Sequence, residues 1–313
     1  MQTKVNLLGY SLSSLEDFFK SINEPKFRAK QLLKWIHQKG VINFNQMTDF
    51  NKLLREKLSS IAHITPPYVD EIFISPEGTK KYLVKLESGS MIEMVRIPEK
   101  KRMTLCISSQ AGCALQCTFC ATGAQGFEKN LTADEIIGQV WLANFHDPKE
   151  KPITNIVFMG MGEPLLNYKN VVQSVKLACC PNEGLGISPK RITISTSGIS
   201  KMINKLAHEN LRCNLALSLH SADDEIRSSL MKINDSNNVE SLSKSLKYFY
   251  EQTKIRPTIE YTLLKGVNDK VSDANKLASF CKNFPTKINI IEYNKIDNGL
   301  FEKSTPSNTE TFI

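Results

Sequence analysis

The stretch with the clearest chemical potential is residues 112–123, GCALQCTFCATG. Cys113, Cys117 and Cys120 follow the spacing C-x3-C-x2-C. Three close thiols can hold three corners of a 4Fe–4S cluster, because thiolates are the usual ligands of such clusters. The fourth iron would then lack a protein ligand, and an open metal position is a reactive one. By spacing alone, the alternatives are a zinc site with His146 as the fourth ligand, a disulfide pair, or buried thiols.

The loop and the residues before it resemble a known enzyme family. C-x3-C-x2-C with Phe119 before the last Cys is similar to the radical S-adenosylmethionine (SAM) enzymes. The longer stretch 104–123 contains Cys106, SSQAG at 108–112 and ATG at 121–123, and it resembles the bacterial dual-specificity RNA methyltransferases. The resemblance runs from the predicted N-terminal helices to about residue 310. It implies methylation of C2 of adenine in 23S rRNA and in tRNA, with a 4Fe–4S cluster and SAM as cofactors.

The resemblance also implies a set of residues that bind SAM. Their side chains suit the charged and polar groups of SAM, although each one alone would be typical of a turn or a cap. The set comprises Gly162, Glu163, Ser195, Ser218, Leu219, His220 and Asn294. Glycine lets the backbone approach a ligand closely, and the Glu163 carboxylate can offset an ammonium charge. We expect Glu163 on the rim of the fold rather than in its core.

Methylation of adenine C2 is difficult because that carbon is not nucleophilic. The resemblance implies that a cysteine outside the cluster loop takes a methyl group from one SAM and that a radical made from a second SAM activates it. A second cysteine then resolves the protein–RNA bond by forming a disulfide. Cys106 matches this resolving cysteine, and Glu93 matches the proposed proton acceptor. By pattern alone, Cys106 could be a small buried hydrophobe and Glu93 a solvent-facing strand residue.

The sequence departs from the family at the methyl-carrying cysteine. The resemblance places that residue in a C-terminal segment beyond residue 313, and residues 295–313 contain no Cys. The other thiols match no family position, and we expect core packing of Cys179, Cys180, Cys213 and Cys281. A chain of these 313 residues is therefore expected to bind SAM without turning over. Two alternative functions are an rRNA adenine-C8 methyltransferase of the same family and a cluster-containing RNA-binding protein without catalysis.

Composition and charge are compatible with these expectations. The 313 residues are 41% apolar and carry a net charge of +8, which favours polyanionic partners such as 23S rRNA and tRNA. Asn6, Glu16 and Asp17 interrupt the apolar residues at the N-terminus, and no apolar run reaches the length of a membrane span. We expect a cytoplasmic protein with reduced thiols and no membrane contact. An electron donor such as flavodoxin and a monomeric state complete the expected partners.

The elements that must position these residues form three predicted domains. Residues 1–64 predict a helical accessory domain, in which Lys26, Arg28, Lys30 and Lys34 are either RNA contacts or a solvated basic face. Residues 65–100 alternate as a small β meander with strands at 71–74, 81–86 and 91–97.

Residues 101–313 predict an α/β domain, with the segment that would follow it in the family missing. Its strands are expected at 103–109, 153–159, 191–195, 214–219, 258–264 and 287–293. Its helices are expected at 133–145, 171–178, 199–209, 239–252 and 273–283. This rhythm indicates a partial (β/α)6 barrel, the core fold that the radical SAM resemblance also implies. Chemistry in β/α barrels gathers at the C-terminal ends of strands, where the candidate residues fall.

Overall fold

The computed structural model describes residues 4–182, 184–296 and 299–313, in two compact units. The first unit contains the described residues of Met1–Ala111, Asn130–Gly160 and Asn167–Ile192. The second unit contains those of Gly112–Lys129, Met161–Leu166 and Thr193–Ile313. The chain passes repeatedly from one unit to the other, so neither unit is one continuous segment.

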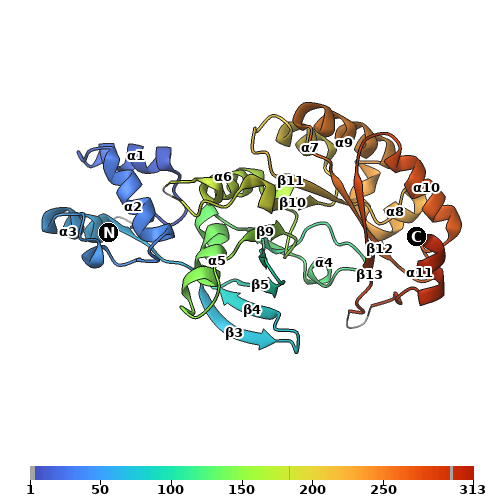
Figure 1. Cartoon of the computed structure of the whole chain (residues 1–313), viewed down its shortest axis with the longest axis horizontal. Helices are drawn as coiled ribbons and strands as arrows, with labels where there is room; N and C mark the ends of the chain where they lie inside the picture. Colours follow the sequence, from blue (N-terminus) through green and yellow to red (C-terminus); the bar gives the residue numbers. More distant parts are fainter. Residues whose placement is uncertain (1–3, 183, 297–298) are drawn as a thin grey trace. The chain divides into compact units, whose positions relative to one another are not determined.

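The N-terminal helices of the first unit are present as predicted. They are α1 (Leu12–Ser21), α2 (Phe27–His37) and α3 (Lys52–Ile61), drawn in blue in Figure 1. The Ser11 hydroxyl caps α1 by accepting a hydrogen bond from the N–H of Ser14 at 3.1 Å. Strand β1 (Val5–Asn6) pairs in parallel with β2 (Ala62–His63) and ties the start of this helical region to its end.

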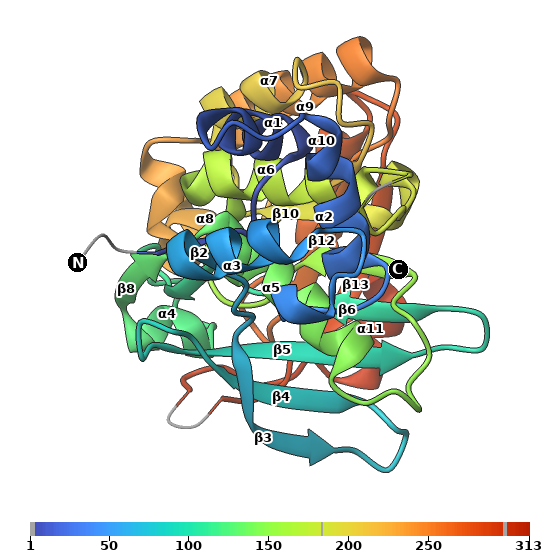
Figure 2. The ribbon, with the colours of Figure 1, turned by 90° about the vertical axis from the view of Figure 1, so that its left-hand side faces the viewer.

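The predicted β meander is also confirmed in the first unit. Strands β3 (Tyr68–Ile74), β4 (Lys80–Lys85) and β5 (Met91–Pro98) run antiparallel, and they lie side by side in Figure 2. Strand β5 then pairs antiparallel with β6 (Met103–Cys106), which pairs in parallel with β9 (Asn155–Phe158). One face of the meander is buried through Tyr82, Val84, Ile92 and Met94. The opposite face keeps half-exposed side chains, as expected for a sheet with one solvated face.

Helices α5 (Ala133–Phe145) and α6 (Tyr168–Cys179) pack against each other in the same unit. Helix α5 has the predicted bounds, and a capping box of Thr132 and Glu135 fixes its start. Because almost every residue of α5 is buried, its apolar stretch serves the core rather than one amphipathic stripe.

The second unit is built on four parallel strands that confirm the predicted strand–helix rhythm. In sheet order they are β13 (Lys287–Glu292), β12 (Thr258–Leu263), β11 (Asn214–Ser218) and β10 (Ile192–Thr196). Helices between and beside these strands are α7 (Ser200–Leu206), α8 (Asp224–Leu230), α9 (Val239–Thr253) and α10 (Val271–Cys281). Helix α7 packs against α9, and both lie on the same side of the strands in Figure 1.

Several short elements were not predicted. They are α4 (Ala121–Gln125), α8, α11 (Pro306–Phe312), β7 (Gln110–Gly112) and β8 (Phe127–Asn130). Single turns of 3-10 helix occur at Phe44–Gln46, Pro164–Asn167, Pro189–Arg191 and Lys232–Asp235. The first barrel strand was predicted too long, because β6 ends at Cys106. The strand therefore ends three residues earlier than expected. Beyond it, the Ser108 hydroxyl donates a hydrogen bond to the main-chain carbonyl of Glu93 at 2.6 Å.

Candidate functional site

The cysteine loop of the second unit is closed by close backbone contacts. The N–H of Cys113 donates to the carbonyl of Gly126 at 2.7 Å. Gly112 has a φ of +71°, and a side chain there would collide with that same carbonyl. A side chain at Gly123 would meet the backbone nitrogen of Cys117 at 2.9 Å. The glycines that flank the thiols therefore allow the loop to fold back on itself.

Cys113, Cys117 and Cys120 are free, half-buried thiols on this loop. Burial raises the pKa of Cys117 to about 12, and the nearby Cys120, Cys113 and Glu163 add to the shift. Burial likewise raises the pKa of Cys113. Cys113 and Cys117 resist ionisation, so they need a strong positive charge nearby before they can act as thiolate ligands. Iron ions supply such a charge, and metal coordination deprotonates thiols outright.

The chemistry of the donor set therefore fits a three-cysteine cluster. Among the residues that the structure describes, no three His, Cys, Asp or Glu side chains form a finished metal site.

Three contacts attach the cysteine loop to other parts of the second unit. The backbone N–H of Thr118 donates to the carbonyl of Leu230, the last residue of α8, at 3.0 Å. The ring of Phe119 packs edge-on against the imidazole of His220, with ring centroids 4.8 Å apart. Cys117 and Phe119 also pack against an apolar cluster that includes Tyr293. Thiol positions are thus fixed by α8 and by the ends of strands β11 and β13.

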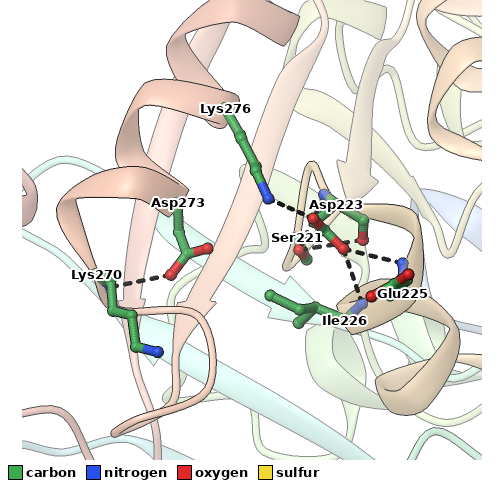
Figure 3. A network of polar contacts seen from close by, with 7 residues as sticks. All are labelled: Ser221, Asp223, Glu225, Ile226, Lys270, Asp273 and Lys276. Carbon is green, nitrogen blue, oxygen red and sulfur yellow. Dashed lines mark hydrogen bonds and ion pairs between the residues drawn. The ribbon is translucent and has the colours of Figure 1, made fainter.

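Helix α8 has a well-defined start. The Asp223 carboxylate accepts the N–H groups of Glu225 at 3.0 Å and Ile226 at 3.1 Å, which caps the helix. Figure 3 shows this carboxylate also paired with Lys276 of α10. The same view shows the side chain of Asp273 accepting the N–H of Lys270 at the start of α10.

The central residue of α8 is Arg227, which sequence analysis did not predict. Its side chain is fully buried. The guanidinium donates to the carbonyls of Ser197 at 2.5 Å and Leu219 at 3.1 Å and to the side chain of Asn234 at 2.9 Å. Burial lowers the pKa of Arg227 to about 10, which leaves it charged at neutral pH. The sequence gives no indication that Arg227 is buried, because it is a single arginine in a short segment after Leu219 and His220.

The structure corrects the expected position of Glu163. Its side chain is 2% exposed, so it does not lie on an open rim. One carboxylate oxygen accepts the N–H of Leu165 at 2.9 Å and the other accepts the N–H of Ser197 at 2.7 Å. Burial raises the pKa of Glu163, and the hydrogen bonds from Ser197 and Leu165 oppose that shift. Glu163 thereby joins the turn after the second barrel strand to the turn after the third.

The other predicted SAM-binding residues also belong to the second unit. Ser195 lies in β10 and is nearly buried, Ser218 ends β11, and Leu219 is fully buried directly after it. Asn294 is exposed just after β13. Gly162 has a φ of +96°, the left-handed region that favours glycine. All of these residues follow or end parallel strands, as predicted.

His220 is held rigidly and stays neutral. Its Nδ1 accepts the N–H of Thr262 at 3.0 Å, so the other ring nitrogen carries the proton. Burial lowers the pKa of His220 to about 3, with a smaller contribution from the charge of Arg227. The buried amide of Asn268, also unpredicted, donates to the His220 carbonyl at 2.6 Å. His220 is thus a fixed neutral donor rather than a residue that titrates near pH 7.

Glu93 and Cys106 belong to the first unit, on neighbouring strands. Val95 of β5 lies opposite Cys106 of β6. Since Glu93 precedes Val95 by two residues, Glu93 and Cys106 lie on the same face of the sheet. Burial raises the pKa of Cys106 to about 11. The carboxylate of Glu93 is half-exposed and pairs with Lys81 at 3.0 Å.

The four basic residues of the N-terminal helices have different surroundings. Lys26, Lys30 and Lys34 are exposed. Arg28 is half-buried, and its guanidinium donates to Gln31 and to the carbonyl of Asp49, both at 2.8 Å. The three lysines therefore lie on the surface, whereas Arg28 has a structural role in the helical region.

Comparisons with known proteins match almost the whole chain. Residues 5–64 match the family model of the ribosomal RNA large subunit methyltransferase N-terminal domain, and residues 107–278 match that of the radical SAM superfamily. The dual-specificity RNA methyltransferase RlmN of Pseudomonas entomophila is 47% identical over 97% of this chain and 81% of that protein. The chain belongs to the RlmN family. The RlmN protein of Marinobacter nauticus is 44% identical over 99% of this chain and 85% of its own.

A solved structure supports the fold of this RlmN-family chain. The crystal structure of a radical SAM methyltransferase from Sphaerobacter thermophilus is similar to this chain, with 34% sequence identity and a TM-score of 0.93. The match covers 98% of this chain and 91% of the other protein's chain. The predicted radical SAM α/β fold is therefore confirmed. The chain is a radical SAM RNA methyltransferase, and its cofactors are a 4Fe–4S cluster and SAM. None of the helices that the structure describes is long and apolar enough to cross a membrane.

Proposed function

We propose that this enzyme methylates C2 of an adenine in 23S rRNA and in tRNA. The proposal depends on the similarity to dual-specificity RNA methyltransferases of the RlmN family, which are 47% and 44% identical over 97% and 99% of this chain. The three-thiol loop and the buried polar groups around it suit the binding of the cluster and of SAM in such a reaction. The alternative without catalysis is disfavoured because the superfamily and the relatives are enzymes.

Cys113, Cys117 and Cys120 are the proposed ligands of the cluster. The bound cluster supplies the electron that cleaves SAM, and the protein supplies position and exclusion of water. The loop is suited to this role because backbone bonds fix its shape while its thiols stay free. Phe119 of the loop packs against the ring of His220.

The proposed SAM site lies at the ends of the parallel strands of the second unit. Gly162, Ser195, Ser218, Leu219, His220 and Asn294 are its proposed binding residues, together with Glu163. The Glu163 carboxylate already accepts two backbone N–H groups, so part of its role is to hold the turns that face SAM. His220 can donate its ring N–H to an acceptor on SAM because its other nitrogen is occupied.

Cys106 is the proposed resolving cysteine and Glu93 the proposed proton acceptor. A thiol with a pKa near 11 is almost fully protonated at neutral pH, so it needs a base before it can attack as a thiolate. Glu93 lies on the same face of the sheet, where a carboxylate can accept a proton from the RNA adduct. The sheet therefore offers a nucleophile and a base on adjacent strands.

The remaining proposals concern domains and partners. Residues 1–64 form an accessory domain that binds RNA through the exposed Lys26, Lys30 and Lys34. Residues 65–100 form the β meander, and residues 101–313 form the radical SAM domain. We further propose a cytoplasmic monomer, without membrane contact, that is reduced by a donor such as flavodoxin. A reducing compartment suits a chain with eight cysteines.

Nucleoside mass spectrometry tests the proposed function. The natural protein, prepared without oxygen, is incubated with SAM, a strong reductant and unmodified 23S rRNA fragments or tRNA. We expect 2-methyladenosine in both RNAs and 5′-deoxyadenosine in the solution. Formation of 8-methyladenosine would instead identify the C8 alternative. A natural protein that contains the methyl-carrying cysteine and cleaves SAM but methylates neither RNA would contradict the proposal.

A further inference from the structure

The open face of the β meander carries aromatic side chains where a solvated sheet would usually carry polar ones. Tyr68 and Phe73 of β3 are 51% and 47% exposed. Tyr68 lies opposite Lys85 of β4 and Phe73 lies opposite Lys81, so the four side chains share one face. Large exposed aromatic side chains on one sheet face are a common sign of a binding surface.

Each ring is accompanied by an ammonium group. The Nζ of Lys81 lies 5.2 Å from the centre of the Phe73 ring, and the Nζ of Lys85 lies 5.9 Å from that of Tyr68. The two lysines are four positions apart on β4, about 13 Å along an extended strand. Glu71 lies opposite Leu83, between the Tyr68–Lys85 pair and the Phe73–Lys81 pair, so an acidic side chain separates the two ammonium groups.

This face continues to the proposed reaction centre. Lys85, Lys81 and Glu93 lie on the same face because Lys81 and Lys85 are an even number of residues from Leu83, the partner of Glu93. Lys81 also binds the Glu93 carboxylate at 3.0 Å. The next strand adds Cys106 to the same face through its partner Val95. The aromatic–lysine pairs thus form the outer part of a surface whose inner part holds the proposed base and nucleophile.

We propose that this surface, the aromatic–lysine face of Tyr68, Phe73, Lys81 and Lys85, binds unpaired nucleotides of the RNA that flank the modified adenine. An aromatic ring stacks on a base of any sequence, and an ammonium group beside it binds the adjoining phosphate. The core of a protein–protein interface is usually depleted of lysine, whereas here each ring is bordered by a lysine ammonium group. This inference rests on the proposed function, since it takes RNA as the substrate.

Binding of RNA by single variants of the whole protein tests the surface. The probes are a fluorescein-labelled RNA hairpin with adenines in its loop and a fully paired duplex of equal length. Fluorescence anisotropy gives Kd over a range of salt concentrations. The variants are Tyr68→Ala, Phe73→Ala and Lys85→Ala, which leave the Lys81–Glu93 pair in place.

Two control variants match these changes. Ile74→Ala removes an exposed apolar side chain from the same strand but from its other face, since Ile74 lies opposite Lys80. Lys244→Ala removes an exposed lysine on α9. Thermal melting of every variant shows whether it is folded, and a variant that melts early is replaced by the milder Tyr68→Leu or Phe73→Leu.

We expect each aromatic variant to weaken binding of the hairpin roughly tenfold, with no change in the salt dependence. Lys85→Ala should weaken binding and lower the slope of log Kd against log salt by about one. The controls should bind as the wild type does, and the duplex should respond much less to the aromatic changes. Unaltered hairpin affinity in folded Tyr68 and Phe73 variants would overturn the surface alone. A wild-type protein that binds neither RNA would count against the proposed function and this surface together.

Discussion

Arg227 binds the main-chain carbonyl of Ser197 at 2.5 Å, across thirty residues of sequence. The same guanidinium binds the carbonyl of Leu219, which follows the next parallel strand. Since Ser197 also donates its N–H to Glu163, a buried cation and a buried carboxylate hold the same loop from two sides. Three strand ends that flank the proposed SAM site are thereby joined through side chains rather than through the sheet.

Replacing Arg227 with Met should destabilise the protein. The change keeps apolar volume but leaves two carbonyls and an amide side chain buried without their donor. We expect the free energy of unfolding of the cluster-free protein to fall by about 3 kcal/mol or more. Urea titration followed by circular dichroism measures this loss. Arg227→Lys, which restores one donor, should recover part of the stability, and equal stability of all three proteins would contradict the role assigned to Arg227.

Glu163→Ala should reduce both stability and SAM affinity. Two backbone N–H groups lose their acceptor in a buried site, which typically costs about 1–3 kcal/mol. Glu163→Gln keeps one carbonyl acceptor and should fall between wild type and Ala. Thermal melting gives the stability, and calorimetry with the clustered protein gives the affinity. If Gln loses affinity as fully as Ala while melting like the wild type, the carboxylate contacts SAM rather than positioning the turns.

Replacing any one of Cys113, Cys117 and Cys120 with Ala should abolish cluster assembly. After anaerobic reconstitution the wild type should hold about four irons per chain, the content of one cube. Iron analysis and the visible charge-transfer absorption measure the outcome. Cys281→Ala is the matched control, because it removes a half-buried thiol from α10 outside the loop. One zinc per chain and no iron in the anaerobically prepared wild type would refute the cluster assignment.

Stability should fall in mild acid because of His37. This residue of α2 is buried, and burial lowers its pKa to about 4 from 6.5, with a small opposing effect of the Leu8 backbone. Between pH 6.5 and pH 4, His37 is protonated in the unfolded chain but remains neutral in the folded chain. The folded state is therefore destabilised as pH falls, by about 2 kcal/mol at pH 5.

Urea titrations at pH 7.5 and pH 5 measure this contribution, with His37→Leu as the reference. The variant cannot bind the proton, so its stability should change less between the two pH values than that of the wild type. An identical change in both proteins would show that other groups cause the acid sensitivity.

Sequence patterns predicted the long elements well. Helix α5 has the predicted bounds because Thr132 and Glu135 form a capping box and a continuous apolar stretch follows them. Short helices such as α8 escaped prediction, since helices of two turns depend on tertiary contacts more than on their own propensity. Arg227 illustrates the reason: its partners lie in loops far along the chain.

The candidate site was predicted in composition but not in burial. Glu163 follows a strand and is charged, which favours an exposed position in sequence terms. Its burial depends on the N–H groups of Leu165 and Ser197, and no local pattern reveals the second of these. The alternation of Glu93 and Val95 in β5 was readable, whereas the alignment of Val95 with Cys106 needed the strand register.

The pairing of Val95 with Cys106 limits how this hairpin can change during evolution. Residues 99–102 form the turn between β5 and β6, where the N–H of Glu99 binds the carbonyl of Arg102 at 2.9 Å. One extra residue within β6 ahead of Cys106 would rotate the thiol to the opposite side of the sheet, away from Glu93. A single inserted residue should therefore be tolerated in the turn, whereas within β6 only an insertion of two residues keeps the thiol on the face of Glu93.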